Sequence, residues 1–385
     1  MPSSRKFPKL GLPQIAALLL LFLFVAQCLW FMAYVPITPM ESSYIEDGLL
    51  HVDRLLNAGT DYRSPLIPVI AGVPARVIDS RGNFMHLSEY RSLIRLPFLL
   101  AGLLLGASLW YVARRLYGNF GGYIALGLYC FSPMVITCSS QVQPDIVGAW
   151  GALGLVFTAI AAAHTLYAPR DVVLWNWKRI LLMAISIALC VGAQWSLWIV
   201  LPPALAFMLW VGHVRPAAAL AIFAAACALA LFFLWGIASF RPAVFAAALR
   251  SAHWIEFSPA QVSAKSVLTL MGLFFLQNGL GTLILLLLSI VSFAAWKRAR
   301  YFGNAAPLIT ALLLIASGLA MQHFAGLLFL FVALPFLILF MAGVSADLLE
   351  TKYAVFANAI IVGVLIANAA LDVGGLLQLA RPAIR

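Results

Sequence analysis

The sequence predicts an all-α protein that crosses a membrane many times. Hydrophobic residues make up 64% and charged residues 10% of its 385 residues, and the mean hydropathy is +1.01. An ordinary soluble domain carries about a quarter charged residues. Apolar runs that are long enough to cross the hydrocarbon core recur along the whole length. We therefore expect a single transmembrane domain over residues 1–385, built as a helical bundle.

The apolar runs predict about eleven transmembrane helices, two of them short. Their expected positions are roughly 12–35, 94–117, 121–138, 146–167, 180–211 (two short helices that meet near Gln194), 217–239, 267–296, 306–321, 326–344 and 354–370. The run over 267–296 is unusually long, so part of it is expected to lie along the membrane.

The distribution of basic residues sets the expected orientation. Lys and Arg gather ahead of the first apolar run and at the end of the second, which places the N-terminus in the cytoplasm. No small-residue cleavage site follows the first run, so it is expected to remain as an uncleaved helix. The outer loops then cover about 36–96 and 240–265, and a helix at the membrane interface is expected in the second. We expect a multi-pass membrane protein.

Charge and cysteine usage exclude other classes. The net charge is +11, but the basic residues are scattered in small groups between apolar runs and form no stripe for nucleic acid. Orientation and contact with membrane lipids explain them. The five cysteines lie in or beside apolar segments without metal-ligand spacing, which indicates neither a disulfide framework nor a zinc site.

The loop over 36–96 is the first place to look for chemistry, because it holds seven of the 13 acidic residues. Helical spacing predicts an amphipathic helix from Glu41 to about Asn57, lying at the outer membrane surface. Glu41 would begin this helix at head-group level, where a partly buried carboxylate can serve as a base. The alternative is that it only complements the positive end of the helix.

A second acid, Asp145, follows Pro144 at the start of the fourth predicted span, on the same face as Glu41. Proline and aspartate are also ordinary residues of a first helical turn, so a structural role stays open. If the two acids converge on one membrane face, a catalytic role is favoured.

Several other polar residues are candidates for binding. Arg63 follows Tyr62 near the interface, where a guanidinium can bind a phosphate or, alternatively, a lipid head group. For Arg95 and for the polar residues of the second outer loop, a solvated or snorkelling role is favoured. Gln194 and His323 are expected at membrane depth, where polar groups are functional or satisfied by packing.

Four stretches together resemble the GT-C superfamily of polyprenyl-phosphate-sugar-dependent glycosyltransferases, which includes protein O-mannosyltransferases and lipid A aminoarabinose transferases. They are ESSYIEDGLLHVDRLLNAG, DYRSPLIPVIAG, SLIRLPFLLAGLLLGASLWYVARRLYG and FSPMVITCSSQVQPDIVGAW, and QHFAGLLFLFVALPFLILF is faintly similar to the final family motif. The first matches the acidic motif and juxtamembrane helix after the first span. The fourth leads to the second outer acid of the family.

The resemblance implies an inverting transfer of a sugar from a polyprenyl phosphate to an acceptor hydroxyl on the outer face. Glu41 and Asp145 would be the catalytic acids, and Arg63 would bind the donor phosphate. Arg250 of the second outer loop is a further, weaker candidate for the donor phosphate. The resemblance also implies a multi-pass protein of the bacterial inner membrane, part of the cell envelope. The acceptor would be a lipid, a glycan or a protein. The remaining expected substrate-binding residues are Tyr44, Glu46, Asp47, Tyr62, Gln143, His253 and His323.

One departure from the family pattern matters for the mechanism. The family has an Asp-Glu pair with a tyrosine three residues after the Glu; Glu41 and Tyr44 fit, but Met40 replaces the aspartate. Either Glu41 is the base, or Glu46 or Asp47 acts after a shift in register, or the protein is an inert relative. A carrier or lipid flippase is the other alternative. The sequence indicates no cofactor and no metal ligands, and a need for a divalent metal stays open.

Overall fold

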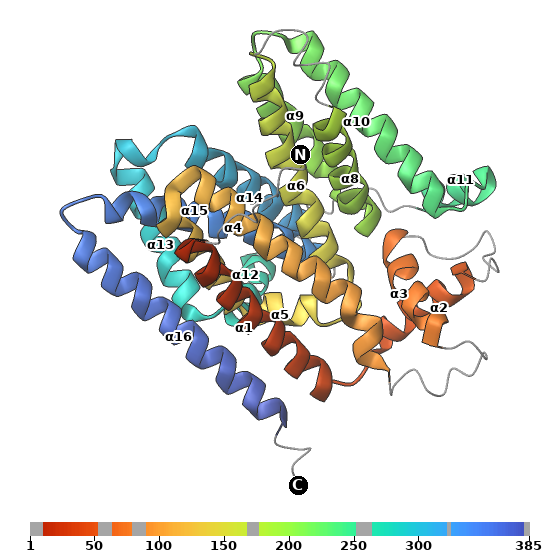
Figure 1. Cartoon of the computed structure of the whole chain (residues 1–385), viewed down its shortest axis with the longest axis horizontal. Coiled ribbons are helices and arrows are strands. Elements are labelled where there is room, and N and C mark those ends of the chain that lie inside the picture. The colour runs from red at the N-terminus through yellow and green to blue at the C-terminus, as the bar shows by residue number, and fades with distance from the viewer. Residues whose placement is uncertain are drawn as a thin grey trace, which may run out of the picture.

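The protein is described by a computed structural model that covers residues 11–52, 64–78, 90–167, 177–251, 264–321 and 325–380. Helices joined by short turns dominate these residues (Figure 1). In chain order they are α1 (Leu12–Tyr34), α2 (Pro39–Val52), α3 (Leu66–Ile78), α4 (Arg91–Cys130), α5 (Pro133–Ser139), α6 (Pro144–Thr165), α8 (Trp177–Ala193), η2 (Trp195–Val200), α9 (Leu201–Val211), α10 (Pro216–Ile237), α11 (Pro242–Ser251), α12 (Ala264–Asn278), α13 (Leu280–Ala295), η4 (Lys297–Ala299), α14 (Phe302–Ala320), α15 (Ala325–Leu349) and α16 (Ala354–Ala380).

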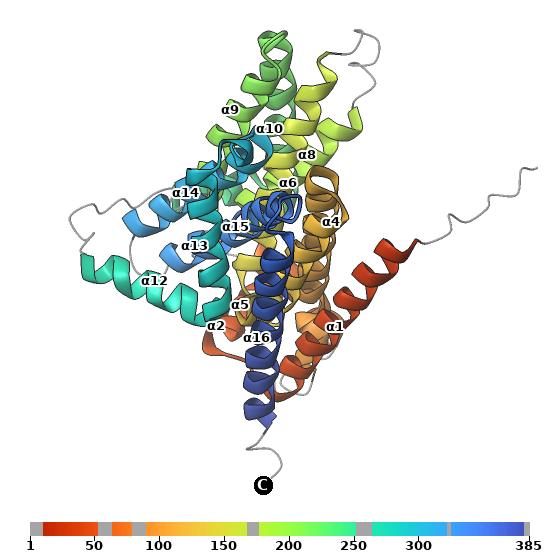
Figure 2. The same ribbon diagram turned by 90° about the vertical axis from the view of Figure 1, so that its left-hand side faces the viewer.

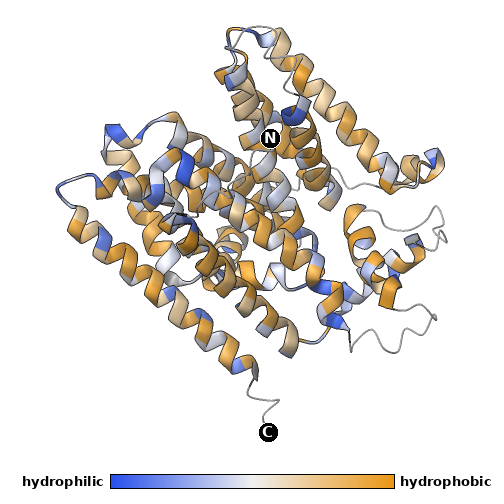
Figure 3. Ribbon diagram, viewed as in Figure 1, coloured by the Kyte–Doolittle hydropathy of each residue, from blue (hydrophilic) through white to orange (hydrophobic). Residues whose placement is uncertain are grey.

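The prediction of an all-α, multi-pass membrane protein is confirmed. Within the described residues, seven helices are long and apolar enough to cross a membrane, and the bent pair α12–α13 would make an eighth. Hydrophobic residues make up most of their length, as the colouring of the ribbon by hydropathy shows (Figure 3). The predicted count of eleven is not confirmed, because α4 contains the second and third predicted spans but counts once, and the two short predicted helices, α8 and the segment formed by η2 and α9, do not reach the length of a full span.

The centre of the bundle is α15, which is almost completely buried between α4, α6, α13 and α14. By contrast, α1, α10 and α16 expose most of their apolar surface and lie at the periphery. Lipid and a protein core both accept apolar side chains, so a helix that is apolar on all sides is compatible with either position.

Two of the predicted breaks between helices are confirmed. The helix α4 is interrupted at Gly118, whose φ of 77° lies in the left-handed region, at the expected turn between the second and third spans. The run over 180–211 divides at Gln194, where the backbone is extended between α8 and η2. Both breaks allow the chain to change direction.

The run over 267–296, in which one span with a part along the membrane is expected, is divided into two helices. The run breaks at Gly279, which has a φ of 82°, and the two parts, α12 and α13, differ in direction by 112° (Figure 2). At this break the buried Asn278 accepts a hydrogen bond from Ser132 Oγ at 2.8 Å and donates to the Phe274 carbonyl oxygen at 2.8 Å. These bonds satisfy an amide that would otherwise be unpaired in an apolar interior.

The amphipathic helix of the first loop is present as α2, and the expected extension to Asn57 lies outside the described residues. The helix α3 was not predicted, because Pro68 and Pro74 disguise its apolar period. The two helices pack side by side (Figure 1), and Gly48 faces Gly72 at their contact. A Cβ at either glycine would overlap the backbone of the other helix. The second loop contains a helix, α11, as expected.

Candidate functional site

The first turn of α2 is fixed by a reciprocal cap. The Thr38 backbone N–H donates to Glu41 Oε2 at 2.9 Å, and the Glu41 N–H donates to Thr38 Oγ1 at 3.3 Å. This is a capping box, in which two helix-end donors are satisfied by side chains. The cap sets the rotation of α2 and so decides which way residues 40 and 41 point.

Glu41 is held in a buried ion pair with Arg95 of α4. Arg95 Nε donates to Glu41 Oε1 at 2.8 Å and Arg95 Nη2 donates to Glu41 Oε2 at 2.7 Å. The side chain of Arg95 is 1% exposed and that of Glu41 is 2% exposed. Arg95 also donates to the carbonyl oxygens of Val35 and Pro36, at 2.8 and 2.9 Å. The prediction that Arg95 is solvated or snorkels is therefore wrong, because α1, α2 and α4 enclose it.

Glu41 also accepts a hydrogen bond from the Val142 backbone N–H, at 2.9 Å. With the capping bond and the two bonds from Arg95, both of its oxygens are occupied. A carboxylate with both oxygens engaged in hydrogen bonds is poorly placed to take a proton from a substrate. The geometry instead gives Glu41 a positioning role, since it connects α2 to α4 and to the segment between α5 and α6.

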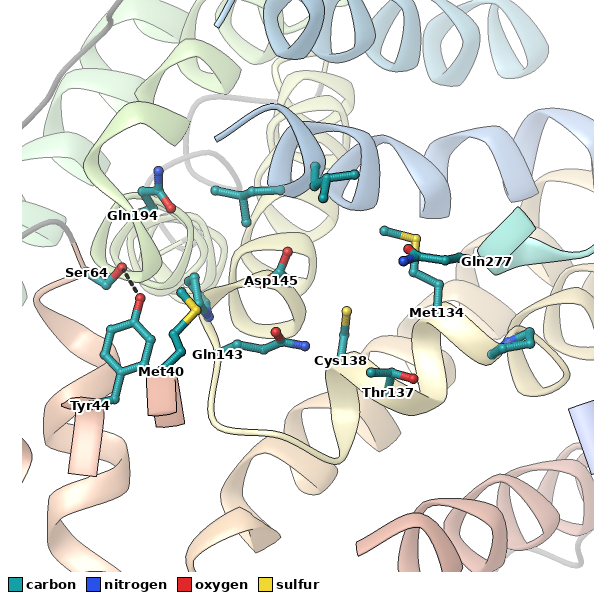
Figure 4. A pocket seen from close by; sticks show the side chains of 14 residues that line it. Met40, Tyr44, Ser64, Met134, Thr137, Cys138, Gln143, Asp145, Gln194 and Gln277 are labelled. Atoms are coloured by element: carbon teal, nitrogen blue, oxygen red, sulfur yellow. Dashed lines mark hydrogen bonds between the residues drawn. The ribbon is translucent and has the colours of Figure 1, made fainter. Parts of the chain in front are cut away.

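Beside this ion pair lies a cavity of about 410 Å³ between α2, α5, α6, α12 and α15 (Figure 4). Glu41 is not among its lining residues, whereas its neighbour Met40 is, with a side chain that is 57% exposed. The polar side chains that line it include Tyr44, Thr137, Gln143, Asp145, Gln194 and Gln277.

Asp145 is the carboxylate of this cavity, and no other acid lines it within the described part of the chain. It lies in the first turn of α6, after the N-cap residue Gln143 and after Pro144, which suits the first helical position. Figure 4 shows its carboxyl group in the space between Gln194 on one side and Gln277 on the other. No lysine or arginine is found among the described lining residues.

The remaining predicted site residues divide into three groups. Tyr44 and Gln143 line the cavity, and the Tyr44 hydroxyl is 3.5 Å from Ser64 Oγ. Glu46, Asp47 and Arg250 are described but do not line it; Glu46 is exposed and accepts from Ser42 Oγ at 3.2 Å, and Arg250 is exposed at the end of α11. Tyr62, Arg63, His253 and His323 lie outside the described residues.

Sequence reasoning missed part of the lining. Thr137 and Met134 come from α5, which reads as the end of an apolar span, and Gln277 precedes the unexpected break at Gly279. The polar pair Gln277-Asn278 inside an apolar run was the signal for this break. Within the described residues, no group of three His, Cys, Asp or Glu side chains could hold a metal ion.

His51 joins α2 to the end of α10. His51 Nε2 lies 2.6 Å from the carbonyl oxygen of Ile237, at the end of α10. Burial lowers the pKa of His51 below its usual 6.5, and Arg241 acts in the same direction, against the opposing effect of the bond to Ile237. The neutral ring is thus the form that the folded protein favours.

This lowered pKa predicts a pH dependence of stability. Protonation of His51 is more favourable in the unfolded chain than in the folded chain. The contribution of His51 to the free energy of unfolding is therefore complete above pH 6.5 and is lost as the pH falls through the lowered pKa. We expect the thermal unfolding midpoint in detergent to fall between about pH 7 and about pH 5, and to fall less in His51→Gln, which keeps a donor for Ile237. Exposed His213 is the control: His213→Gln should behave as wild type. Equal pH profiles for wild type and His51→Gln would contradict the expectation.

Comparisons with known proteins agree with the helical architecture. Residues 84–238 match the model of the dolichyl-phosphate-mannose-protein mannosyltransferase family. ArnT from Cupriavidus metallidurans, in the apo state, superposes with a TM-score of 0.62 at 15% identity, over 95% of this chain and 76% of ArnT. The structure of ArnT bound to undecaprenyl phosphate gives the same TM-score at 13% identity, over 95% of this chain and 75% of ArnT. No curated protein matches the chain by sequence.

The oligosaccharyltransferase of Archaeoglobus fulgidus superposes with a TM-score of 0.58 at 14% identity, over 93% of this chain. The match covers 52% of that enzyme, so the chain spans about half of its length. The resemblance to the GT-C superfamily is confirmed by these matches. At such low identity, the structural likeness concerns the fold.

Proposed function

Since the chain has the transmembrane fold of the GT-C glycosyltransferases, we propose that it transfers a sugar from a polyprenyl-phosphate donor to an acceptor hydroxyl. The observation that carries the proposal is the cavity with its single described carboxylate, Asp145. ArnT has been solved with undecaprenyl phosphate and the archaeal enzyme AglB with a dolichol-phosphate, which supports a lipid-linked donor here. The acceptor is a lipid, a glycan or a protein.

In the proposed reaction, the acceptor oxygen attacks the anomeric carbon from the face opposite the phosphate, so the configuration inverts. The bond from the anomeric carbon to the phosphate oxygen breaks, and the phosphate leaves with the electron pair. Asp145 takes the proton of the acceptor hydroxyl, because Glu41 is occupied by Arg95 and Met40 has no basic group. Glu41 is a positioning residue that holds α2 against the cavity.

The charge that develops on the leaving phosphate needs a cation. The described lining residues supply none; we assign this role to Arg63 on the resemblance of its motif, and propose Arg250 as a second basic residue from the second outer loop. We also propose that the reaction takes place at the periplasmic face of the bacterial inner membrane. The N-terminus then lies in the cytoplasm, and residues 1–385 form one transmembrane domain. The asymmetry of Lys and Arg supports this orientation.

A catalytically inert relative is the second candidate, and Met40 is the observation that favours it. It occupies the position of the family aspartate and faces the cavity, so one of the two usual acids is lost from the site. An inert relative could still bind the donor without transferring the sugar. Binding and transfer must therefore be measured separately.

The test uses purified protein in liposomes with radiolabelled polyprenyl-phosphate sugars. Release or transfer of the sugar is followed by chromatography, and donor binding by a thermal shift of the protein. The proposal expects turnover by wild type and by Glu350→Gln, a matched change of an exposed acid outside the cavity. Donor binding without turnover across a broad panel would favour the inert relative, and transbilayer movement of an unchanged donor would favour a carrier.

A further inference from the structure

Three glutamines from distant parts of the chain meet in the cavity. Gln143 precedes α6, Gln194 lies between α8 and η2, and Gln277 lies near the end of α12. In Figure 4, Gln194 and Gln277 lie on opposite sides of Asp145, and Gln143 lies on a third side. Their convergence requires the fold, since 134 residues (277 − 143) separate the first from the last.

Two of these glutamines occur at helix breaks in otherwise apolar segments. Gln194 is the extended residue between α8 and η2, with φ −156° and ψ 130°, and Gln277 comes two residues before Gly279, where α12 ends. Irregular backbone at membrane depth is tolerated where it lines a cavity. The chain therefore places an amide at the cavity at one break, Gln194, and in the last turn of the helix before the other, Gln277.

The amide of Asn278, next to Gln277, has a structural role at the same break. Asn278 is fully buried and is held by Ser132, by the Phe274 carbonyl and by Met134 Sδ, at 2.8, 2.8 and 3.3 Å. Gln277 is exposed to the cavity instead. Gln194 Nε2 donates to Ser196 Oγ at 3.1 Å, which uses one of its hydrogens and leaves the rest of the amide available.

The chemistry of the lining indicates the kind of sugar that fits. An amide offers one acceptor and two donors and carries no charge, which matches hydroxyl groups that donate and accept. A sugar carboxylate would lie beside the Asp145 carboxylate, and two like charges in one site disfavour each other. A sugar ammonium would pair with Asp145 and remove the proposed base.

We propose that Gln194 and Gln277 recognise hydroxyl groups of an uncharged sugar, so that the lipid-linked donor carries a neutral sugar rather than an amino sugar or a sugar acid. This inference rests on the proposed function, because it assigns the sugar class of the same site. Amides that a bound sugar covers disfavour a ligand that leaves them unpaired, and this selects hydroxyls over apolar or mismatched groups.

The experiment compares three donors with the same polyprenyl phosphate, which carry a neutral hexose, an amino sugar and a sugar acid. Thermal shift measures binding of each donor and of the sugar-free lipid phosphate, and the liposome assay measures kcat/KM. We expect the neutral donor to bind most tightly. We expect Gln194→Leu and Gln277→Leu each to weaken its binding by roughly 10-fold, with the sugar-free lipid unaffected.

Gln378→Leu, on an exposed position of α16, is the matched control and should bind all donors as wild type does. Gln194→Glu should shift the preference toward the amino sugar, since it adds a negative charge. Tighter binding of a charged donor by wild type, or unchanged binding of the neutral donor in both Leu variants, would overturn the inference. Selective binding of the neutral donor without any transfer would instead reject the proposed function and keep the inference.

Discussion

Asp145→Asn is expected to lower the rate of sugar transfer by about 10²- to 10⁴-fold, the usual contribution of a general base. The asparagine keeps the size of the side chain and its place in the first turn of α6, but it cannot take the acceptor proton. Donor binding should change little, because the proposed contacts to the sugar come from the glutamines. The measurement is single-turnover transfer in liposomes, with binding by thermal shift.

Glu41→Gln separates the two candidate acids. If Glu41 were the base, the kcat of Glu41→Gln would fall as far as the kcat of Asp145→Asn. Because both Glu41 oxygens are occupied by Arg95, Thr38 and Val142, we expect mainly lost stability and a kcat per folded molecule within about 10-fold of wild type. A larger loss of kcat per folded molecule in Glu41→Gln than in Asp145→Asn would show that Glu41 is the base.

Arg95→Leu is expected to destabilise the protein by about 3–5 kcal/mol, the cost of leaving a buried charge without its partner. Glu41 would lose its two bonds from the guanidinium, and the carbonyl oxygens of Val35 and Pro36 would lose their donors. The midpoint of unfolding in detergent, followed by tryptophan fluorescence, measures the effect.

The exposed pair Arg298–Glu350 provides the control for this prediction. Its atoms are 2.6 Å apart, but the side chains are 62% and 65% exposed. An exposed pair contributes about 0–1 kcal/mol, so Arg298→Leu should change the midpoint little. Equal shifts of the unfolding midpoint in Arg95→Leu and Arg298→Leu would show that burial does not determine how much the Arg95–Glu41 pair contributes to stability.

The sequence predicted those features that depend on local pattern. Basic residues and a glycine mark the turn at Gly118, the polar notch at Gln194 marks the break before η2, and alternating apolar and acidic residues mark α2. In each case a polar or small residue interrupts a long apolar run. Such interruptions are visible because little else in a membrane segment is polar.

The partners of the site residues could not be predicted in this way. Glu41 and Arg95 are 54 positions apart, and each has an ordinary local explanation, as a helix-start acid and as an interfacial arginine. Their pairing depends on how α2 and α4 pack. It follows from the capped first turn of α2 that Glu41 faces Arg95 and Met40 faces the cavity.

The central claim is that the donor sugar binds in the cavity beside Asp145, and photolabelling tests it most directly. A polyprenyl phosphate with a photoreactive sugar is bound to the protein in liposomes, crosslinked and mapped by mass spectrometry. We predict adducts on the α5–α6 segment that contains Thr137 and Asp145, removed by excess unlabelled donor and by the cavity-filling change Thr137→Trp. Labelling confined to lipid-facing residues such as Ile366 of α16, without competition, would contradict the account.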